Sequence, residues 1–139
     1  MISRLIAVCA ALFFAQGCSH TKAVIFDANG LEKEVVDVTT SRGKSIEVLD
    51  GLAFRTIPLK RINDLNISSR ETKSHDGELY YLAEIWLTDG SKVQTYLLPD
   101  GRRSGAYVNV NTLLLAKTPN GAYQIQIKDV KKVQFVRAH

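Results

Sequence analysis

The sequence predicts an all-β fold, in which one or more small barrel-like antiparallel sheets are built from two related hairpin blocks. Runs rich in β-branched residues have the length of strands, as in Val35–Thr40. Turn signals such as Asp89-Gly90 and Asn120-Gly121 separate these runs. Beyond the N-terminal segment, no window has apolar residues at helical spacing. The composition, 45% hydrophobic and 23% charged, is that of a globular protein.

The first block is expected to hold four short strands. They are Ala23–Phe26, Val35–Thr40, Ser45–Leu49 and Ala53–Leu59. Ser41–Lys44 reads as a turn from which the third strand returns along the second, and Asp50-Gly51 as the next turn.

The second block is expected to begin at Glu78, after a polar, loop-like stretch over Thr72–Gly77. A long strand over Tyr80–Thr88 should turn at Asp89-Gly90 and pair with Lys92–Leu98. A longer loop then runs from Pro99 to Gly105, and two further strands flank the turn Thr118–Gly121.

Two segments repeat the same apolar spacing 68 residues apart, Ile57–Ile67 and Ile125–Phe135. Each is apolar at its positions 1, 3, 6, 9 and 11, and each follows a predicted hairpin. This spacing of apolar residues predicts a strand, one tight helical turn and a second strand. A duplication predicts that these ten side chains point inward and pair by position; the alternative is two unrelated strand–turn–strand pieces. The ten residues are Ile57, Leu59, Ile62, Leu65, Ile67, Ile125, Ile127, Val130, Val133 and Phe135.

The segment Glu84–Ser91, the turn at Asn120-Gly121 and the Ile125–Phe135 ending together resemble a small barrel of the Sm-like or Src-homology-3-like kind. The resemblance implies five short strands that curl up, with one turn of tight helix before the last strand. Because each block alone would be marginal in size, we expect the two blocks to share one core or to pack firmly together.

The N-terminus has the pattern of a secretory signal peptide, which is expected to form a signal helix before cleavage. One basic residue, Arg4, precedes eleven apolar residues over Leu5–Ala15, and small residues follow. A bilayer-spanning helix needs about 20 such residues, so this run is too short to be one.

The stretch Ala15-Gln16-Gly17-Cys18 resembles the lipobox of bacterial lipoproteins. The resemblance implies a diacylglycerol on the Cys18 thiol, cleavage before it, and acylation of the new amine with a fatty acid such as palmitate. Ser19 is compatible, in that family, with delivery to the outer membrane. Ala15 stands where Leu is usual and Gln16 is large, so ordinary secretion after Gly17 and a retained helix stay as alternatives.

The predicted organisation has three parts. A lipoprotein signal peptide covers residues 1–17, a short lipid-anchored tether covers 18–22, and a compact all-β domain covers 23–139, with possible sub-blocks 23–72 and 77–139. Of the two cysteines, Cys9 would be removed with the signal peptide, which leaves Cys18 as the only thiol of the mature chain.

The sequence shows no constellation typical of catalysis, and we predict no enzyme, no cofactor and no metal site. The histidines are expected in the tether, in a polar loop and at the C-terminus, outside any strand: His20, His75 and His139. His75 with Asp76 and Glu78 is the single local cluster of possible metal ligands, and a solvated loop is the preferred interpretation. Charges of both signs are scattered along the chain, which excludes a nucleic-acid-binding arm.

Aromatic residues on the predicted Tyr80–Leu98 hairpin are the candidate recognition surface. Tyr80, Trp86 and Tyr96 could form an exposed platform that stacks on sugar or holds a peptide, or a second packing surface between the two blocks, the interpretation we favour. The expected function is a non-catalytic binding or structural module at the periplasmic face of the outer membrane. Its expected partners are the membrane, through the lipid, and an envelope protein or peptidoglycan. A peptidoglycan- or glycan-binding module and a small envelope enzyme are the alternatives.

Overall fold

The computed structural model describes residues 21–93, 96–101 and 103–137. The predicted signal peptide and Cys18 lie outside these residues. The all-β prediction is confirmed, because the described residues form strands joined by turns and two short 3-10 helices. The strands are β1 (Lys22–Asp27), β2 (Glu32–Thr40), β3 (Ser45–Asp50), β4 (Ala53–Pro58), β5 (Ile62–His75), β6 (Glu78–Leu87), β7 (Tyr96–Leu97), β8 (Arg103–Ser104), β9 (Ala106–Asn109), β10 (Leu113–Thr118), β11 (Gly121–Gln126) and β12 (Val130–Val136). The 3-10 helices are η1 (Leu59–Arg61) and η2 (Ile127–Asp129).

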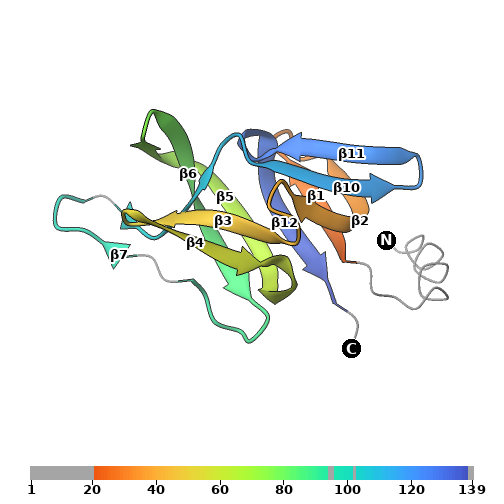
Figure 1. Ribbon diagram of the computed structural model, residues 1–139, viewed down its shortest axis with the longest axis horizontal. Helices are drawn as coiled ribbons and strands as arrows, with labels where there is room; N and C mark the ends of the chain where they lie inside the picture. The colour runs from red at the N-terminus through yellow and green to blue at the C-terminus, as the bar shows by residue number, and fades with distance from the viewer. Residues whose placement is uncertain (1–20, 94–95, 102, 138–139) are drawn as a thin grey trace.

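Ten strands form one curled antiparallel sheet with the order β11-β10-β2-β1-β12-β5-β6-β9-β3-β4 (Figure 1). β7 and β8 pair separately as a two-stranded ribbon. No helix in the described residues is long and apolar enough to cross a membrane.

The sheet has an internal two-fold pseudosymmetry. From its centre outward, the order is β12-β1-β2-β10-β11 on one side, called the β12 half, and β5-β6-β9-β3-β4 on the other, called the β5 half. The hairpin β3–β4, η1 and the start of β5 have equivalents 68 residues further along the chain, in β10–β11, η2 and β12. The predicted strand–turn–strand repeat is therefore present in the structure.

The register at the centre of the sheet follows the same symmetry. Leu65 pairs with Val133, and this pair is flanked by Asp64 with Gln134 and by Asn66 with Lys132. Positions 64, 65 and 66 are equivalent to 132, 133 and 134, so exchanging the two strands maps the pairing onto itself. The pseudo-two-fold axis passes through the Leu65–Val133 pair.

The two halves exchange strands. The first sequence block runs through β1–β5, yet β1 pairs with β12 and β2 pairs with β10. The second block runs through β6–β12, yet β6 pairs with β5 and β9 pairs with β3. Each half of the sheet thus takes two strands from one block and three from the other, so the two sequence blocks are not two separate spatial units.

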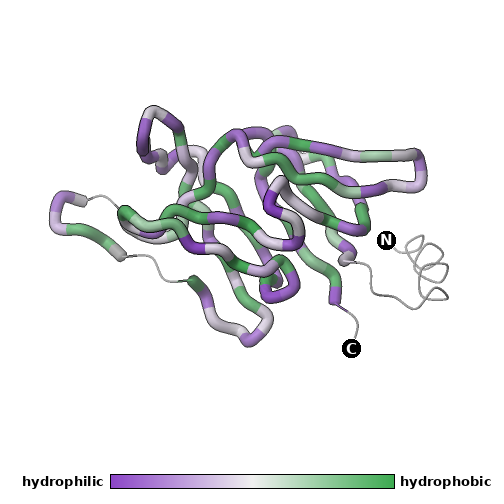
Figure 2. Tube along the Cα trace, viewed as in Figure 1, coloured by the Kyte–Doolittle hydropathy of each residue, from purple (hydrophilic) through white to green (hydrophobic). Residues whose placement is uncertain are grey.

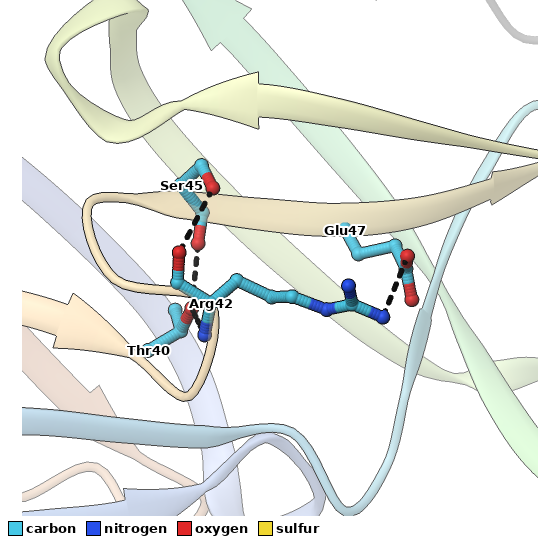
Figure 3. Close-up of polar contacts among 4 residues, drawn as sticks. All are labelled: Thr40, Arg42, Ser45 and Glu47. Atoms are coloured by element: carbon cyan, nitrogen blue, oxygen red, sulfur yellow. Dashed lines mark hydrogen bonds and ion pairs between the residues drawn. The ribbon is translucent and has the colours of Figure 1, made fainter.

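The exchange begins at the turn between β2 and β3 (Figure 3). The prediction that Ser45–Leu49 returns along Val35–Thr40 is wrong, because β3 lies between β4 and β9. Thr40 is 4% exposed, and its hydroxyl donates to the Ser45 carbonyl at 2.5 Å and accepts from the Arg42 amide at 2.9 Å. The Arg42 guanidinium lies 2.9 Å from Glu47. A buried hydroxyl thus satisfies backbone groups where the chain crosses between halves.

One hydrophobic core spans both halves. Hydrophobic and hydrophilic residues alternate along the strands, as expected for a sheet with one buried face (Figure 2). Of the ten residues in the repeated segments, eight are buried in this core, and Ile67 and Ile125 are partly buried against it. The expectation of a shared core is met.

The β6 hairpin departs from the prediction. Trp86 pairs with Lys92, and the Val93 amide donates to the Ile85 carbonyl at 2.9 Å. Tyr96 then pairs with Ser104 in the separate ribbon, and β9 takes the place beside β6. The prediction that Lys92–Leu98 pairs along β6 is therefore wrong beyond Val93.

Candidate functional site

Tyr80 and Trp86 lie on the same face of β6 but in different surroundings. Tyr80 is 5% exposed and packs in a second apolar cluster with Leu49, Leu82 and Tyr107. Trp86 is 38% exposed, and six residues of strand place it about 20 Å from Tyr80. The side chain of Tyr96 lies outside the described residues. The structure therefore separates the predicted platform residues, with Tyr80 serving packing and Trp86 left accessible.

Polar neighbours hold the Trp86 ring in place. Its indole Nε1 donates to Glu84 Oε1 at 3.3 Å. The Lys92 ammonium lies 3.3 Å from Glu84 Oε2 and 5.4 Å from the centre of the indole ring. A cation this close to an aromatic face is attracted by the ring quadrupole. Glu84 and Lys92 thus fix an exposed ring that has one apolar face and a polar edge.

Asp64 pairs with Trp86 across the β5–β6 ladder. Its Oδ2 accepts a long hydrogen bond from the Asn63 amide at 3.4 Å. Its Oδ1 is buried and has no hydrogen-bond partner in the described part of the chain. Buried polar atoms are nearly always paired, so this oxygen is an exception, and it lies on the strand next to the exposed Trp86.

Four polar residues at the symmetry axis extend this surface, and we call them the central polar block. Asp64 pairs with Gln134 and Asn66 pairs with Lys132, on either side of the buried Leu65–Val133 pair. Because strand residues alternate between faces, all four side chains lie on the face opposite the core. The block offers one carboxylate, one ammonium and two amides, which are hydrogen-bond donors and acceptors without a net charge.

His75 occupies a different place from the one predicted. β5 continues to His75 and turns at Asp76-Gly77, so the stretch expected as a loop is mostly strand and His75 lies within it. The His75 ring lies between Phe54, at 5.8 Å, and Tyr80, at 6.3 Å. Across residues 21–93, 96–101 and 103–137, no group of three or more His, Cys, Asp or Glu residues could hold a metal ion.

The central polar block was not predicted from the sequence, although the repeated segments contain it. Asp64 and Asn66 flank Leu65 in one copy, and Lys132 and Gln134 flank Val133 in the other. The alternation showed that these residues face away from the core, but only the pairing of β5 with β12 brings the two copies together. No family model matches the chain, and no curated protein matches its sequence.

Proposed function

We propose that this chain is a non-catalytic binding module of the cell envelope, held at the periplasmic face of the outer membrane by a lipid on Cys18. The observation that carries the proposal is the position of Cys18, directly after a signal-peptide pattern and four residues before β1 begins at Lys22. Four extended residues span at most about 14 Å, so the lipid would hold the sheet close to the membrane surface. The curled sheet, with a 3-10 turn before the last strand of each sequence block, β5 and β12, supports the resemblance to small Sm-like or Src-homology-3-like barrels.

The anchor is tested with a Cys18→Ala variant of the full chain, expressed in a bacterium that processes lipoproteins and grown with labelled palmitate. We expect the wild type to carry label and to sediment with outer membranes, and the variant to carry no label and to become soluble or stay unprocessed. Cys9→Ala is the matched control, because that cysteine would be discarded with the signal peptide. A Cys18→Ala protein that is processed and still sediments with membranes would contradict the anchor.

A second candidate function, glycan or peptidoglycan binding, is favoured by the surface around Trp86. An exposed indole can stack on the apolar face of a sugar while neighbouring polar groups bind its hydroxyls. The side-chain amides of Asn66 and Gln134, on the same face of the sheet, can donate to and accept from such hydroxyls.

This binding is tested by co-sedimentation of the full-length protein with isolated peptidoglycan sacculi and by titration with N-acetylglucosamine oligosaccharides. Trp86→Ala should abolish retention, whereas Leu52→Ala, which removes an 86% exposed side chain on a distant turn, should bind like the wild type. Equal retention of wild type and Trp86→Ala would contradict a role for this surface.

A further inference from the structure

Phe26 is the residue equivalent to Trp86 under the pseudo-two-fold symmetry. Ile25 pairs with Val133 in the β12 half as Ile85 pairs with Leu65 in the β5 half. One step further, Phe26 pairs with Lys132 as Trp86 pairs with Asp64, and both ladders shift register at the following step. The two aromatic rings are therefore equivalent positions of the two halves.

Phe26, like Trp86, lies on the face opposite the core and has a cation over its ring. Phe26 is half-buried, next to the fully buried Ile25, and the Lys132 ammonium lies 6.0 Å from its ring centre. The matching cation for Trp86 is Lys92, at 5.4 Å. An aromatic ring with a neighbouring cation thus stands on each side of the axis.

The central polar block lies between the two rings. The strands are ordered β1, β12, β5 and β6, so three strand spacings separate Phe26 from Trp86, and the two residues also differ by two positions along the strands. At about 4.8 Å per strand and 3.3 Å per residue, the backbone positions of the two residues are about 16 Å apart along the sheet. That separation exceeds the size of one sugar ring and suits an extended chain of several sugars.

The charge of this face argues for a neutral ligand. Within the block, the carboxylate of Asp64 balances the ammonium of Lys132, and the amides of Asn66 and Gln134 carry no charge. A phosphate-rich polyanion would need an excess of Lys or Arg here, which these four residues do not supply. Amides that both donate and accept match the hydroxyl and acetamido groups of a glycan.

Building on the proposed glycan-binding function, we propose that the outer face of β1, β12, β5 and β6 binds one uncharged glycan strand across both halves. Trp86 stacks on one sugar, Phe26 stacks on a second sugar further along the strand, and the central polar block binds the sugars between them. Phe26 is thus a second binding position, used only by ligands long enough to reach it.

The experiment compares a disaccharide and a hexasaccharide of β-1,4-linked N-acetylglucosamine, titrated calorimetrically into the full-length protein in detergent. A second stacked ring gives about tenfold in affinity, so the wild type should bind the hexasaccharide about tenfold more tightly than the disaccharide. Phe26→Ala should remove most of this difference and leave disaccharide binding unchanged, whereas Trp86→Ala should weaken the binding of both sugars.

Phe26→Leu is the companion variant, because it keeps the apolar contacts of the half-buried side chain but has no ring to stack. It should melt close to the wild type and still lose most of the preference for the longer sugar. The inference is overturned if folded Phe26 variants keep that preference, or if the wild type binds both sugars equally while Trp86→Ala weakens both. The latter result would leave glycan binding at Trp86 intact. If the wild type binds neither sugar nor sacculi, the glycan-binding function fails and this inference fails with it.

Discussion

The two halves of the sheet have the same strand order but very different outer faces. In the β5 half, Leu49 pairs with Tyr107, and both are buried in the second apolar cluster. The equivalent pair in the β12 half is Lys117 with Val36, where Lys117 is exposed and forms an ion pair with Asp37 at 3.6 Å. The shared backbone therefore determines the inner core but leaves each outer face free to be apolar or charged.

Two additional segments accompany the apolar outer face of the β5 half. In the β5 half, the ribbon β7–β8 lies in the chain between β6 and β9, whereas in the β12 half β2 follows β1 directly. β5 also extends past the repeated segment to His75. From this extension, the Lys73 ammonium reaches the Gly51 carbonyl at 3.1 Å and lies 5.6 Å from the Tyr107 ring. The extension thus packs over the second cluster, which leaves the centre of the sheet as the part of the outer face that is shared by both halves and open.

The largest expected effect comes from breaking the core that the two halves share. Val130→Asp and Ile62→Asp each place a carboxylate at equivalent buried positions, 4% and 0% exposed. Each should cost about 4 kcal/mol or more, through lost burial and an unpaired buried charge. Lys131→Ala, at an exposed neighbouring position, should stay within about 0.5 kcal/mol. Urea unfolding followed by fluorescence and circular dichroism should show one transition; two separate transitions would contradict the shared core.

The outer faces are compared directly by Leu49→Ala and Lys117→Ala, which occupy equivalent positions. Leu49 is fully buried, and its truncation should cost about 2–5 kcal/mol. The Lys117 side chain is 71% exposed, and its ion pair with Asp37 should contribute less than about 1 kcal/mol. Equal losses in the two variants, measured by chemical denaturation, would show that the second cluster does not stabilise the β5 half.

Local sequence patterns predicted the elements well, because each depends on residues close in the chain. The spacing of apolar residues in the segments 57–67 and 125–135 predicted η1 and η2, each between two strands. The pairing of the strands was harder to predict, because the turn sequence at Ser41–Lys44 is compatible with a strand that pairs back and with one that crosses to the other half. The buried Thr40 hydroxyl at that crossing is a tertiary feature, since its burial depends on distant strands.

The candidate site was only partly predictable for the same reason. Alternation along Tyr80–Leu87 placed Tyr80 and Trp86 on one face, but their different burial depends on β3 and β9, which are distant in sequence. Phe26 and the polar residues of β12 join this face only through the exchanged pairing. A surface assembled from both blocks has no continuous signature in the sequence.

A smaller effect is expected when the two aromatic rings of the outer face, Trp86 and Phe26, are removed. Replacing a core tryptophan by alanine lowers the free energy of unfolding by about 3–5 kcal/mol. Trp86 is 38% exposed, so Trp86→Ala should cost only about 1–2 kcal/mol, and the half-buried Phe26 should lose about 2 kcal/mol when replaced by alanine. Melting curves of both variants beside Leu49→Ala test this. A loss for Trp86→Ala as large as that for Leu49→Ala would favour packing over recognition as its role.

The smallest effect is expected at two equivalent turns that use different side chains. Gly30 and Gly90 adopt left-handed backbone, with φ of 86° and 89°, and each amide closes its turn. In the first turn, Asp27 Oδ1 accepts from the Asn29 and Leu31 amides at 2.9 and 3.0 Å. In the second turn, Asp89 at the third position accepts hydrogen bonds from Ser91 instead.

That aspartate, Asp89, accepts from the Ser91 hydroxyl at 2.6 Å and from the Ser91 amide at 2.9 Å. These bonds favour the carboxylate and lower the pKa of Asp89 below its ordinary value. Its contribution to stability is therefore present above about pH 4, the ordinary pKa of aspartate, and is lost as the pH falls through the lowered native pKa. Ser91→Ala should raise the Asp89 pKa toward its ordinary value, measured by carboxyl-carbon NMR, and slightly lower the melting temperature at pH 7. Below the lowered native pKa, where the carboxyl is protonated in both proteins, the melting temperatures should converge. An unchanged Asp89 titration in Ser91→Ala would show that the serine does not set this pKa.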